Sequence, residues 1–311
     1  MILTRTLLLS VLLGFCTFVR AEPPLPVTVS LLPQQFFVER IGGQQVKTIV
    51  LVPPGKSPAT YEPTPKQMEA VAASRLVLRI GVPFENAWLP RMAQLAPAAK
   101  VVDLRDGLTM RPVDLPPGAA PGTGGTPDPH VWLAPPLVMR MADRIRDELI
   151  ALRPEAKTEF EANHARFIAD LKALDGDIRS RLAAKKVRNF MVYHPSWGYF
   201  ADAYGLRQMP VEAGWKEPGP RTLQMVIEGA RQSGVRVVFV QPQFSQKEAE
   251  TIAQAIGGEV VAVDPLAPDY IGNLRRVADI FARNLQSVSR RLWSAPGLPS
   301  TGTGTRCSMA S

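Results

Sequence analysis

The stretch NFMVYHPSWGYFADAYGL, residues 189–206, decides the fold class of this chain. It opens with the apolar run Phe190–Tyr193, which predicts a buried strand, and continues into the aromatic-rich segment Trp197–Tyr204, which predicts a helix. Between the two stands His194, one of three histidines in 311 residues. Because ligand-binding groups of open α/β sheets collect at the carboxyl ends of strands, His194 is a first candidate functional residue. Taken alone, the same position also suits a histidine with only a structural role.

Strands alternate with helical segments on both sides of this stretch. This spacing is typical of βαβ units, and it predicts parallel sheets with both faces covered by helices. The strands that we predict are residues 26–32, 48–52, 76–80, 100–104, 189–193, 208–211, 235–240 and 259–263. They fall into two groups of four, so we expect an α/β fold with two lobes.

A long helical pattern separates the two groups of strands. From Pro154, apolar residues such as Phe160, Phe167 and Leu171 recur at intervals of three, four or seven. A helix of about 30 residues is about 45 Å long, more than one small domain needs, so we predict a rigid link between two lobes. His164 lies on this helix, and we expect it to face solvent. The boundaries are an N-terminal lobe at 22–153, a linking helix at 154–186 and a C-terminal lobe at 187–293.

The two ends of the chain are expected to lie outside the fold. Residues 1–21 combine Arg5, an apolar run of about a dozen residues and a small-x-Ala ending, which predicts a signal peptide cleaved after Ala21. The run is too short to cross a bilayer, which takes about 20 apolar residues. Cys16 follows the bulky Phe15, which argues against lipid attachment. The tail, residues 294–311, is rich in Ser, Gly, Thr and Pro and is expected to be disordered.

Composition excludes several kinds of protein. The net charge of +8 comes from scattered basic residues, so nucleic-acid binding has little support. Cys16 and Cys307 are the two cysteines, one in the predicted signal and one in the tail. The exported chain would therefore lack an internal disulfide and a zinc site built from cysteines, and a 46% hydrophobic composition must supply its stability.

Three polar residues are expected to meet at one edge of the fold. Asp264 follows the strand 259–263 as His194 follows its own strand, and His130 ends the Pro/Gly-rich loop 111–127, in which we find no packable face. Each residue could also serve only in a turn or a helix cap. Together, two imidazoles and a carboxylate predict a site for Zn²⁺, and Mn²⁺ is the second choice.

The segments around these residues resemble the zinc/manganese-binding solute-binding proteins of bacterial ABC transporters, the ZnuA/TroA-like group. The resemblance runs in order over almost the whole mature chain. Its segments are LVPPGKSPATYEPTP (51–65), DPHVWLAPPLVMRMADRI (128–145), VYHPSWGYFADAYGL (192–206), KEPGPRTL (216–223), VVFVQPQFSQKEAETIAQAIG (237–257) and VVAVDPLAPDYIGNLR (260–275). It implies two α/β lobes joined by a rigid helix, with one metal ion in the cleft between them.

The resemblance also implies roles for particular residues. It makes His130, His194 and Asp264 metal ligands. The family usually has a further histidine after Ser-Pro, whereas Ser57-Pro58 is followed here by Ala59, so the site is one ligand short. Glu62 and Glu212 are the acids to check as replacements, although Glu62 also suits a turn. The histidine-rich loop of the family is absent, since 111–127 contains no histidine.

These observations predict a periplasmic, monomeric binding protein that captures Zn²⁺, or less readily Mn²⁺, and delivers it to an ABC permease in the inner membrane. One alternative is a different cation, or a metal that carries its own chelator into the vacant position. Others are a degenerate binder and, remotely, a zinc hydrolase, for which the sequence offers no acid/base or nucleophile pair. We therefore expect no enzymatic activity.

Overall fold

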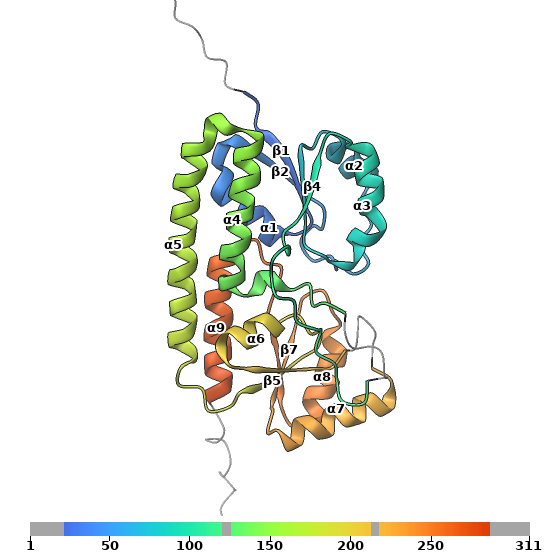
Figure 1. Ribbon diagram of the computed structural model, residues 1–311. Coiled ribbons are helices and arrows are strands. Elements are labelled where there is room, and N and C mark those ends of the chain that lie inside the picture. The colour runs from blue at the N-terminus through green and yellow to red at the C-terminus, as the bar shows by residue number, and fades with distance from the viewer. Residues whose placement is uncertain (1–21, 120–125, 213–217, 287–311) are drawn as a thin grey trace, which may run out of the picture.

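The computed structural model describes residues 22–119, 126–212 and 218–286. The predicted signal peptide, the tail and both cysteines lie outside the described residues. Two α/β lobes are stacked along one axis, and the long helix α5 (Lys157–Leu182) runs beside both of them (Figure 1). The prediction of two parallel-sheet lobes is therefore confirmed.

The first lobe is a four-stranded parallel sheet in the order β2-β1-β3-β4. Val27 in the centre of the sheet pairs with Thr48 on one side and Leu76 on the other. Its strands are β1 (Leu25–Val29), β2 (Val46–Val50), β3 (Leu76–Arg79) and β4 (Lys100–Asp103). Its helices are α1 (Leu32–Gly42), α2 (Pro65–Ala72), α3 (Pro83–Leu95) and α4 (Pro135–Leu152), with 3₁₀ turns η1 (Gly43–Gln45) and η2 (Val131–Leu133).

The second lobe repeats this arrangement in the order β6-β5-β7-β8, again fully parallel. The strand predicted around Phe190 lies in the interior of the sheet, which explains why it reads as a continuous apolar run. The strands are β5 (Asn189–Val192), β6 (Arg207–Pro210), β7 (Val237–Val240) and β8 (Glu259–Ala262). The helices are α6 (Gly198–Tyr204), α7 (Pro220–Gln232), α8 (Gln246–Ala255) and α9 (Tyr270–Gln286).

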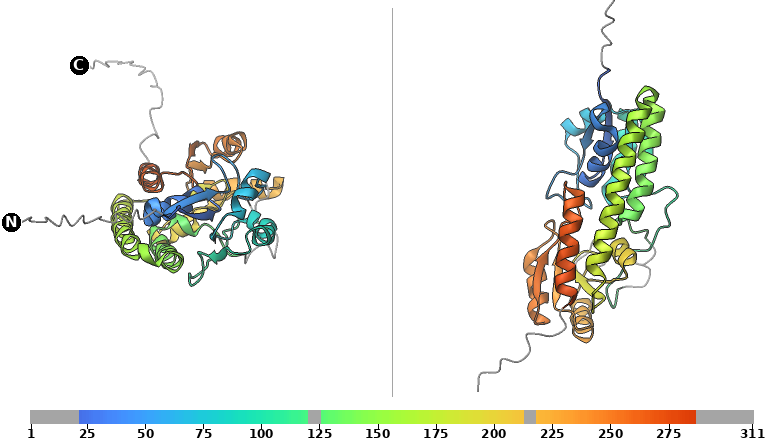
Figure 2. Two further views of the ribbon diagram at one scale, coloured as in Figure 1. Left: turned by 90° about the horizontal axis from the view of Figure 1, so that it is seen from above. Right: turned by 90° about the vertical axis from the view of Figure 1, so that its left-hand side faces the viewer.

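Helix α5 follows the short turn η3 (Pro154–Ala156) and links the lobes along the chain. Packing between side chains links the lobes as well. Helix α9 lies beside α5 (Figure 2), and the ring of Tyr270 at its start packs edge-on against Phe37 of α1, with centroids 4.9 Å apart. A continuous set of buried side chains therefore runs from β1 through Phe167 of α5 to Phe281 of α9. This shared core should resist large movements of one lobe against the other.

The expectation that His164 faces solvent is wrong, because α4 covers that side of α5. His164 is only 9% exposed. Its Nε2 lies 2.8 Å from an oxygen of Asp143, and its Nδ1 lies 3.4 Å from Nη1 of Arg146, both on α4. Position 164 lies on the face of α5 that packs against α4, together with the buried Phe160 and Phe167, and not on the face that is open to solvent.

The Pro/Gly-rich loop was expected to have no packable face, but its described part, Arg111–Ala119, lies against the second lobe. The amide of Gln208 in β6 donates to Asp114 over 2.8 Å. Gly118 approaches Met225 of α7 so closely that a Cβ atom there would lie 2.6 Å from the sulfur. The loop packs through carboxylates, prolines and bare backbone, and none of these gives a hydrophobic periodicity in the sequence.

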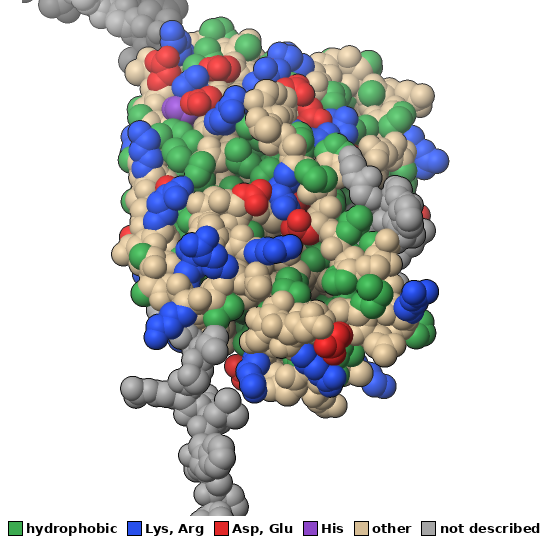
Figure 3. All heavy atoms as spheres, turned by 60° about the horizontal axis from the view of Figure 1, so that its bottom comes forward, with side chains coloured by type: hydrophobic (Ala, Val, Ile, Leu, Met, Phe, Trp, Pro, Cys, Tyr) green, Lys and Arg blue, Asp and Glu red, His purple; other side chains and the backbone are tan. Residues whose placement is uncertain are grey.

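The face shown in Figure 3 carries basic and acidic side chains set among apolar and uncharged ones. Several arginines of the second lobe pair with acids: Arg179 with Asp175 over 2.8 Å, and Arg275 with Asp177 over 3.1 Å. The positive charge of the chain is thus distributed and partly neutralised, as its sequence suggested.

Candidate metal centre

His130 is held at the end of the first lobe's last loop, where the chain enters η2 and α4. Its backbone N–H donates to Oδ1 of Asp128 over 3.0 Å, and its Nδ1 lies 2.6 Å from the same oxygen. Asp128 is completely buried, and His130 is 4% exposed. A carboxylate at Nδ1 fixes the ring with the proton on that nitrogen, which leaves the lone pair on Nε2 for a ligand.

His194 is held in the same way in the second lobe, just past the carboxyl end of β5. Its Nδ1 lies 3.0 Å from an oxygen of Glu212, and the ring of Phe244 stacks on it with centroids 5.0 Å apart. The amide of Gln241 donates to its backbone carbonyl over 2.8 Å. Burial, and then the neighbouring charge of His130, lower the pKa of His194 well below its ordinary value. The ring is therefore a neutral imidazole near pH 7, the form that binds metals.

The two imidazoles meet between the lobes with their Nε2 atoms 3.3 Å apart. Zinc binds imidazole nitrogen at about 2.0–2.1 Å and prefers tetrahedral angles, which places two such nitrogens about 3.3 Å from each other. With a carboxylate beside each Nδ1, the Nε2 atom of each ring is the nitrogen that is turned toward the other lobe. The spacing and the chemistry of the pair therefore fit two ligands of one tetrahedral ion.

Asp264 lies nearby in the fold but has partners of its own. Its Oδ1 accepts from the backbone N–H of Leu266 over 2.9 Å and from the amide of Gln243 over 3.3 Å. Next to it, the carbonyl of Pro265 accepts from the indole of Trp132 over 2.8 Å, and the Trp132 ring lies 5.2 Å from that of His130. Among the residues that the structure describes, no group of three or more His, Cys, Asp or Glu side chains is arranged to hold a metal ion. The structure thus brings the two histidines together without completing a three-residue set.

Of the other residues considered for the site, Glu212 contacts a histidine of the pair, whereas Glu62 lies exposed. Ala59 has no ligating side chain, and its N–H donates to the hydroxyl of Ser57 over 3.2 Å. Sequence reasoning did not find the roles of Asp128 and Gln241. Asp128 had a signal, since an Asp two residues before a His can bond both its backbone and its ring.

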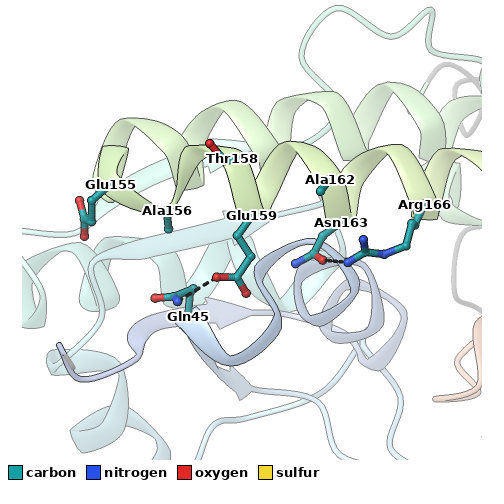
Figure 4. A pocket seen from close by; sticks show the side chains of 8 residues that line it. All are labelled: Gln45, Glu155, Ala156, Thr158, Glu159, Ala162, Asn163 and Arg166. Carbon is teal, nitrogen blue, oxygen red and sulfur yellow. Dashed lines mark hydrogen bonds between the residues drawn. The ribbon is translucent and has the colours of Figure 1, made fainter. Parts of the chain in front are cut away.

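A groove on the described surface lies elsewhere. It has a volume of about 590 Å³ and contains none of the three histidines (Figure 4). Gln45 bonds to Glu159 across it over 3.0 Å, and Asn163 bonds to Arg166. It is lined by Gln45, Glu155, Ala156, Thr158, Glu159, Ala162, Asn163 and Arg166. An open polar groove beside the start of α5 has no evident connection to the histidine pair.

A buried pair of imidazoles between two parallel-sheet lobes defines a solute-binding protein of the metal-binding class. Residues 27–284 match the family model described as "Zinc-uptake complex component A periplasmic", ZnuA, and the chain belongs to this family. The family match and the solved structures confirm the expected family and fold. The family is one of solute-binding transport proteins rather than enzymes. No described helix has both the length and the apolar character needed to cross a membrane.

Relatives with known roles agree with this assignment. The chain is 27% identical over 253 residues to the high-affinity zinc uptake system protein ZnuA of Bacillus subtilis (strain 168), which covers 78% of each chain. It is also 27% identical over 314 residues to the protein of that name from Haemophilus ducreyi, covering 90% of this chain and 98% of the relative.

Solved structures agree as well. A zinc-bound deletion mutant of ZnuA is 39% identical, with a TM-score of 0.78 over 85% of this chain and 99% of that one. The solute-binding protein FpvC from Pseudomonas aeruginosa, in complex with Mn²⁺, is 23% identical with a TM-score of 0.72, covering 85% of this chain and 98% of FpvC. That second likeness is one of fold alone.

Proposed function

We propose that this chain captures Zn²⁺ between its lobes and presents it to the permease of an ABC importer. The observation that carries the proposal is the 3.3 Å separation of the Nε2 atoms of His130 and His194, each with its Nδ1 beside a carboxylate. Two imidazole ligands favour Zn²⁺ over Mn²⁺, which prefers oxygen ligands.

The proposed ligand set is His130, His194 and Asp264. The hydrogen bonds that the described residues make to the Asp264 side chain use Oδ1, so Oδ2 is the atom that would turn to the ion. Zinc usually takes four ligands, so one position remains beyond these three, and Ala59 has no side chain that could fill it. A water molecule or a small ligand carried in with the ion would fill that position.

The remaining parts of the proposal concern location and partners. The segment 1–21 would direct export to the periplasm with cleavage after Ala21, and the protein would act there as a monomer. Its partners would be the metal ion and the inner-membrane permease, without nucleic acid. The shared core of the two lobes favours release of the ion through small changes around the site rather than wide opening.

Titration of the metal-free mature protein with Zn²⁺ and Mn²⁺, in competition with a coloured chelator, tests the proposal. We expect one tightly held Zn²⁺ per chain and weaker Mn²⁺ binding. His194→Ala should weaken Zn²⁺ binding more than about 100-fold, since the loss of a ligand should exceed the effect of losing a ligand's partner. Asp264→Ala should weaken it less. His164→Gln changes the one histidine outside the site and should bind like the wild type.

Two results would contradict the proposal: wild-type protein that takes up no stoichiometric zinc, or a His194→Ala variant with unchanged affinity. An unchanged Asp264→Ala variant would remove Asp264 from the ligand set and leave the two histidines. Mn²⁺ binding tighter than Zn²⁺ would reverse the choice of ion.

A further inference from the structure

Arg111 stands where the loop before His130 meets helix α6 of the second lobe. Its guanidinium forms a two-pronged ion pair with Asp114, at 2.9 and 3.1 Å. It also reaches Asp128 over 3.3 Å and Asp202 of α6 over 2.9 Å. One cation therefore holds a carboxylate of its own loop, the carboxylate that fixes His130 and a carboxylate of the second lobe.

The loop ends are joined at the same point. The backbone N–H of Asp128 donates to the carbonyl of Arg111 over 2.9 Å, which closes the loop at its base. The hydroxyl of Tyr199 in α6 accepts from the N–H of Arg111 and donates to the carbonyl of Asp128, each over 3.1 Å. The segment that carries His130 is thus fastened to the second lobe by hydrogen bonds of the Tyr199 hydroxyl as well as by charge.

The buried carboxylate of Asp128 needs the positive charge of Arg111 beside it. This carboxylate is completely buried, and Oδ1 is used by the N–H and the ring of His130. Oδ2 faces Arg111. A buried carboxylate is costly unless its oxygens are paired, so the guanidinium allows Asp128 to act as an acceptor for His130.

Helix α6 connects the same cation to His194, because α6 begins at Gly198, four residues after that histidine. Gly198 lies against the guanidinium, and a Cβ atom there would fall 1.6 Å from Nη1 of Arg111 and 2.9 Å from Oδ2 of Asp128. A glycine at this position lets the start of α6 approach Arg111. The two histidines are therefore tied to one guanidinium, His130 through Asp128 and His194 through the first turn of α6.

We propose that Arg111 is the positioning residue of the metal site, which sets the spacing of the two imidazoles by joining the Asp128–His130 pair to helix α6. The proposal rests on the proposed function, since it concerns how the same site holds its ion. It assigns Arg111 no contact with the ion itself. Lysine carries the charge but lacks the planar, multiple donors that three carboxylates require here, so it cannot replace Arg111.

The test compares Arg111→Lys and Arg111→Gln with Gly198→Ala, which keeps Arg111 but displaces it. The proposal expects each variant to bind Zn²⁺ about 10- to 100-fold more weakly, the range typical of residues that orient metal ligands. It also expects the visible absorption of bound Co²⁺ to lose tetrahedral intensity, a change that general destabilisation would not produce. Thermal unfolding of the metal-free proteins identifies a variant that has not folded, in which case the other two decide.

Arg179→Gln is the matched control, because Arg179 also pairs with an aspartate, Asp175, and lies over a tyrosine ring, that of Tyr204. It should bind Zn²⁺ and Co²⁺ like the wild type. Folded Arg111 variants with wild-type affinity and wild-type Co²⁺ spectra would overturn the positioning role alone. Wild-type protein without stoichiometric zinc would instead overturn the proposed function, so the two failures are distinguishable.

Discussion

The two sheets share one strand order, yet their carboxyl edges carry different chemistry. In the second lobe, His194 lies past β5, Gln241 past β7 and Asp264 past β8, and the histidine turns its ring toward the other lobe. In the first lobe, Ser30 lies past β1, and its hydroxyl donates to the buried Glu85 over 2.6 Å.

Glu85 also accepts from the backbone N–H groups of Ile80 and Gly81, over 2.9 and 2.7 Å. The carboxylate of Glu85 thus accepts hydrogen bonds from the loops of its own lobe, while the carboxylate of Glu212 in the second lobe holds the ring of His194. The first lobe supplies its histidine from a loop instead. Repeating a fold therefore repeats the positions of a site but not its function, which depends on what each polar group is paired with.

Of the predicted differences between the two sheet edges, the largest is an effect on the free energy of unfolding. Glu85→Ala would leave the hydroxyl of Ser30 and two backbone N–H groups without their buried acceptor. A buried unsatisfied donor costs roughly 1–3 kcal/mol, so the free energy of unfolding should fall by roughly 3 kcal/mol or more. Denaturant unfolding of the metal-free protein measures this. A loss below about 1 kcal/mol would show that water replaces the carboxylate easily.

The matching change in the second lobe should affect binding. Glu212→Gln removes the charge beside Nδ1 of His194, and Zn²⁺ binding should weaken about 10- to 100-fold, since partners of metal-binding histidines have effects of this size. Competition with a chelator measures the affinity, and the exposed Glu228→Gln serves as control. Equal affinity of the Glu212 and Glu228 variants would remove the contrast between the edges.

Ala59→His should reduce the asymmetry by giving the first lobe a second imidazole. If the side chain reaches the ion, Zn²⁺ binding should tighten about 10-fold, equivalent to about 1.4 kcal/mol. Thr60→His, one residue further along and exposed, controls for a general effect of added histidine. Equal affinities of the two variants would show that position 59 does not face the site.

The smallest predicted effect is on how the stability of the fold depends on pH. Burial raises the pKa of Glu85 above its ordinary value of 4.5. The folded chain therefore binds this proton more tightly than the unfolded chain, so the stabilisation is fully present below pH 4.5 and is lost as pH rises through the raised pKa. Relative to Glu85→Gln, the wild type should lose stability from pH 4 toward neutral pH in denaturant titrations. If the stability of the wild type relative to Glu85→Gln rose with pH, the raised pKa of Glu85 would be contradicted.

Much of the fold could be predicted, because most strands contain a short apolar run next to a turn signal. The strand predicted at 259–263, for example, is observed as Glu259–Ala262. The burial of His164 was missed, because the sequence gives the period of a helix but not the number of neighbours around it. The packing of Arg111–Ala119 was missed because polar and proline contacts leave no periodic signal.

The meeting of the two histidines could be predicted from the sequence, whereas the contacts that hold their rings could not. His194 was found from its place at a strand end, and His130 from the end of a loop within a recognisable motif. The pairing of Asp128 with Arg111, and of Gln241 with the backbone of His194, depends on how loops and strands lie side by side. Such contacts follow from the assembled structure and not from spacing along the chain.

X-ray absorption spectroscopy of the zinc-loaded mature protein tests the central claim most directly. The account predicts one Zn²⁺ per chain in a tetrahedral shell that contains two imidazole nitrogens at about 2.0–2.1 Å. The same measurement on His130→Ala and His194→Ala should show the loss of one imidazole each, or of the ion. A shell without imidazole, or one that neither substitution changes, would contradict it.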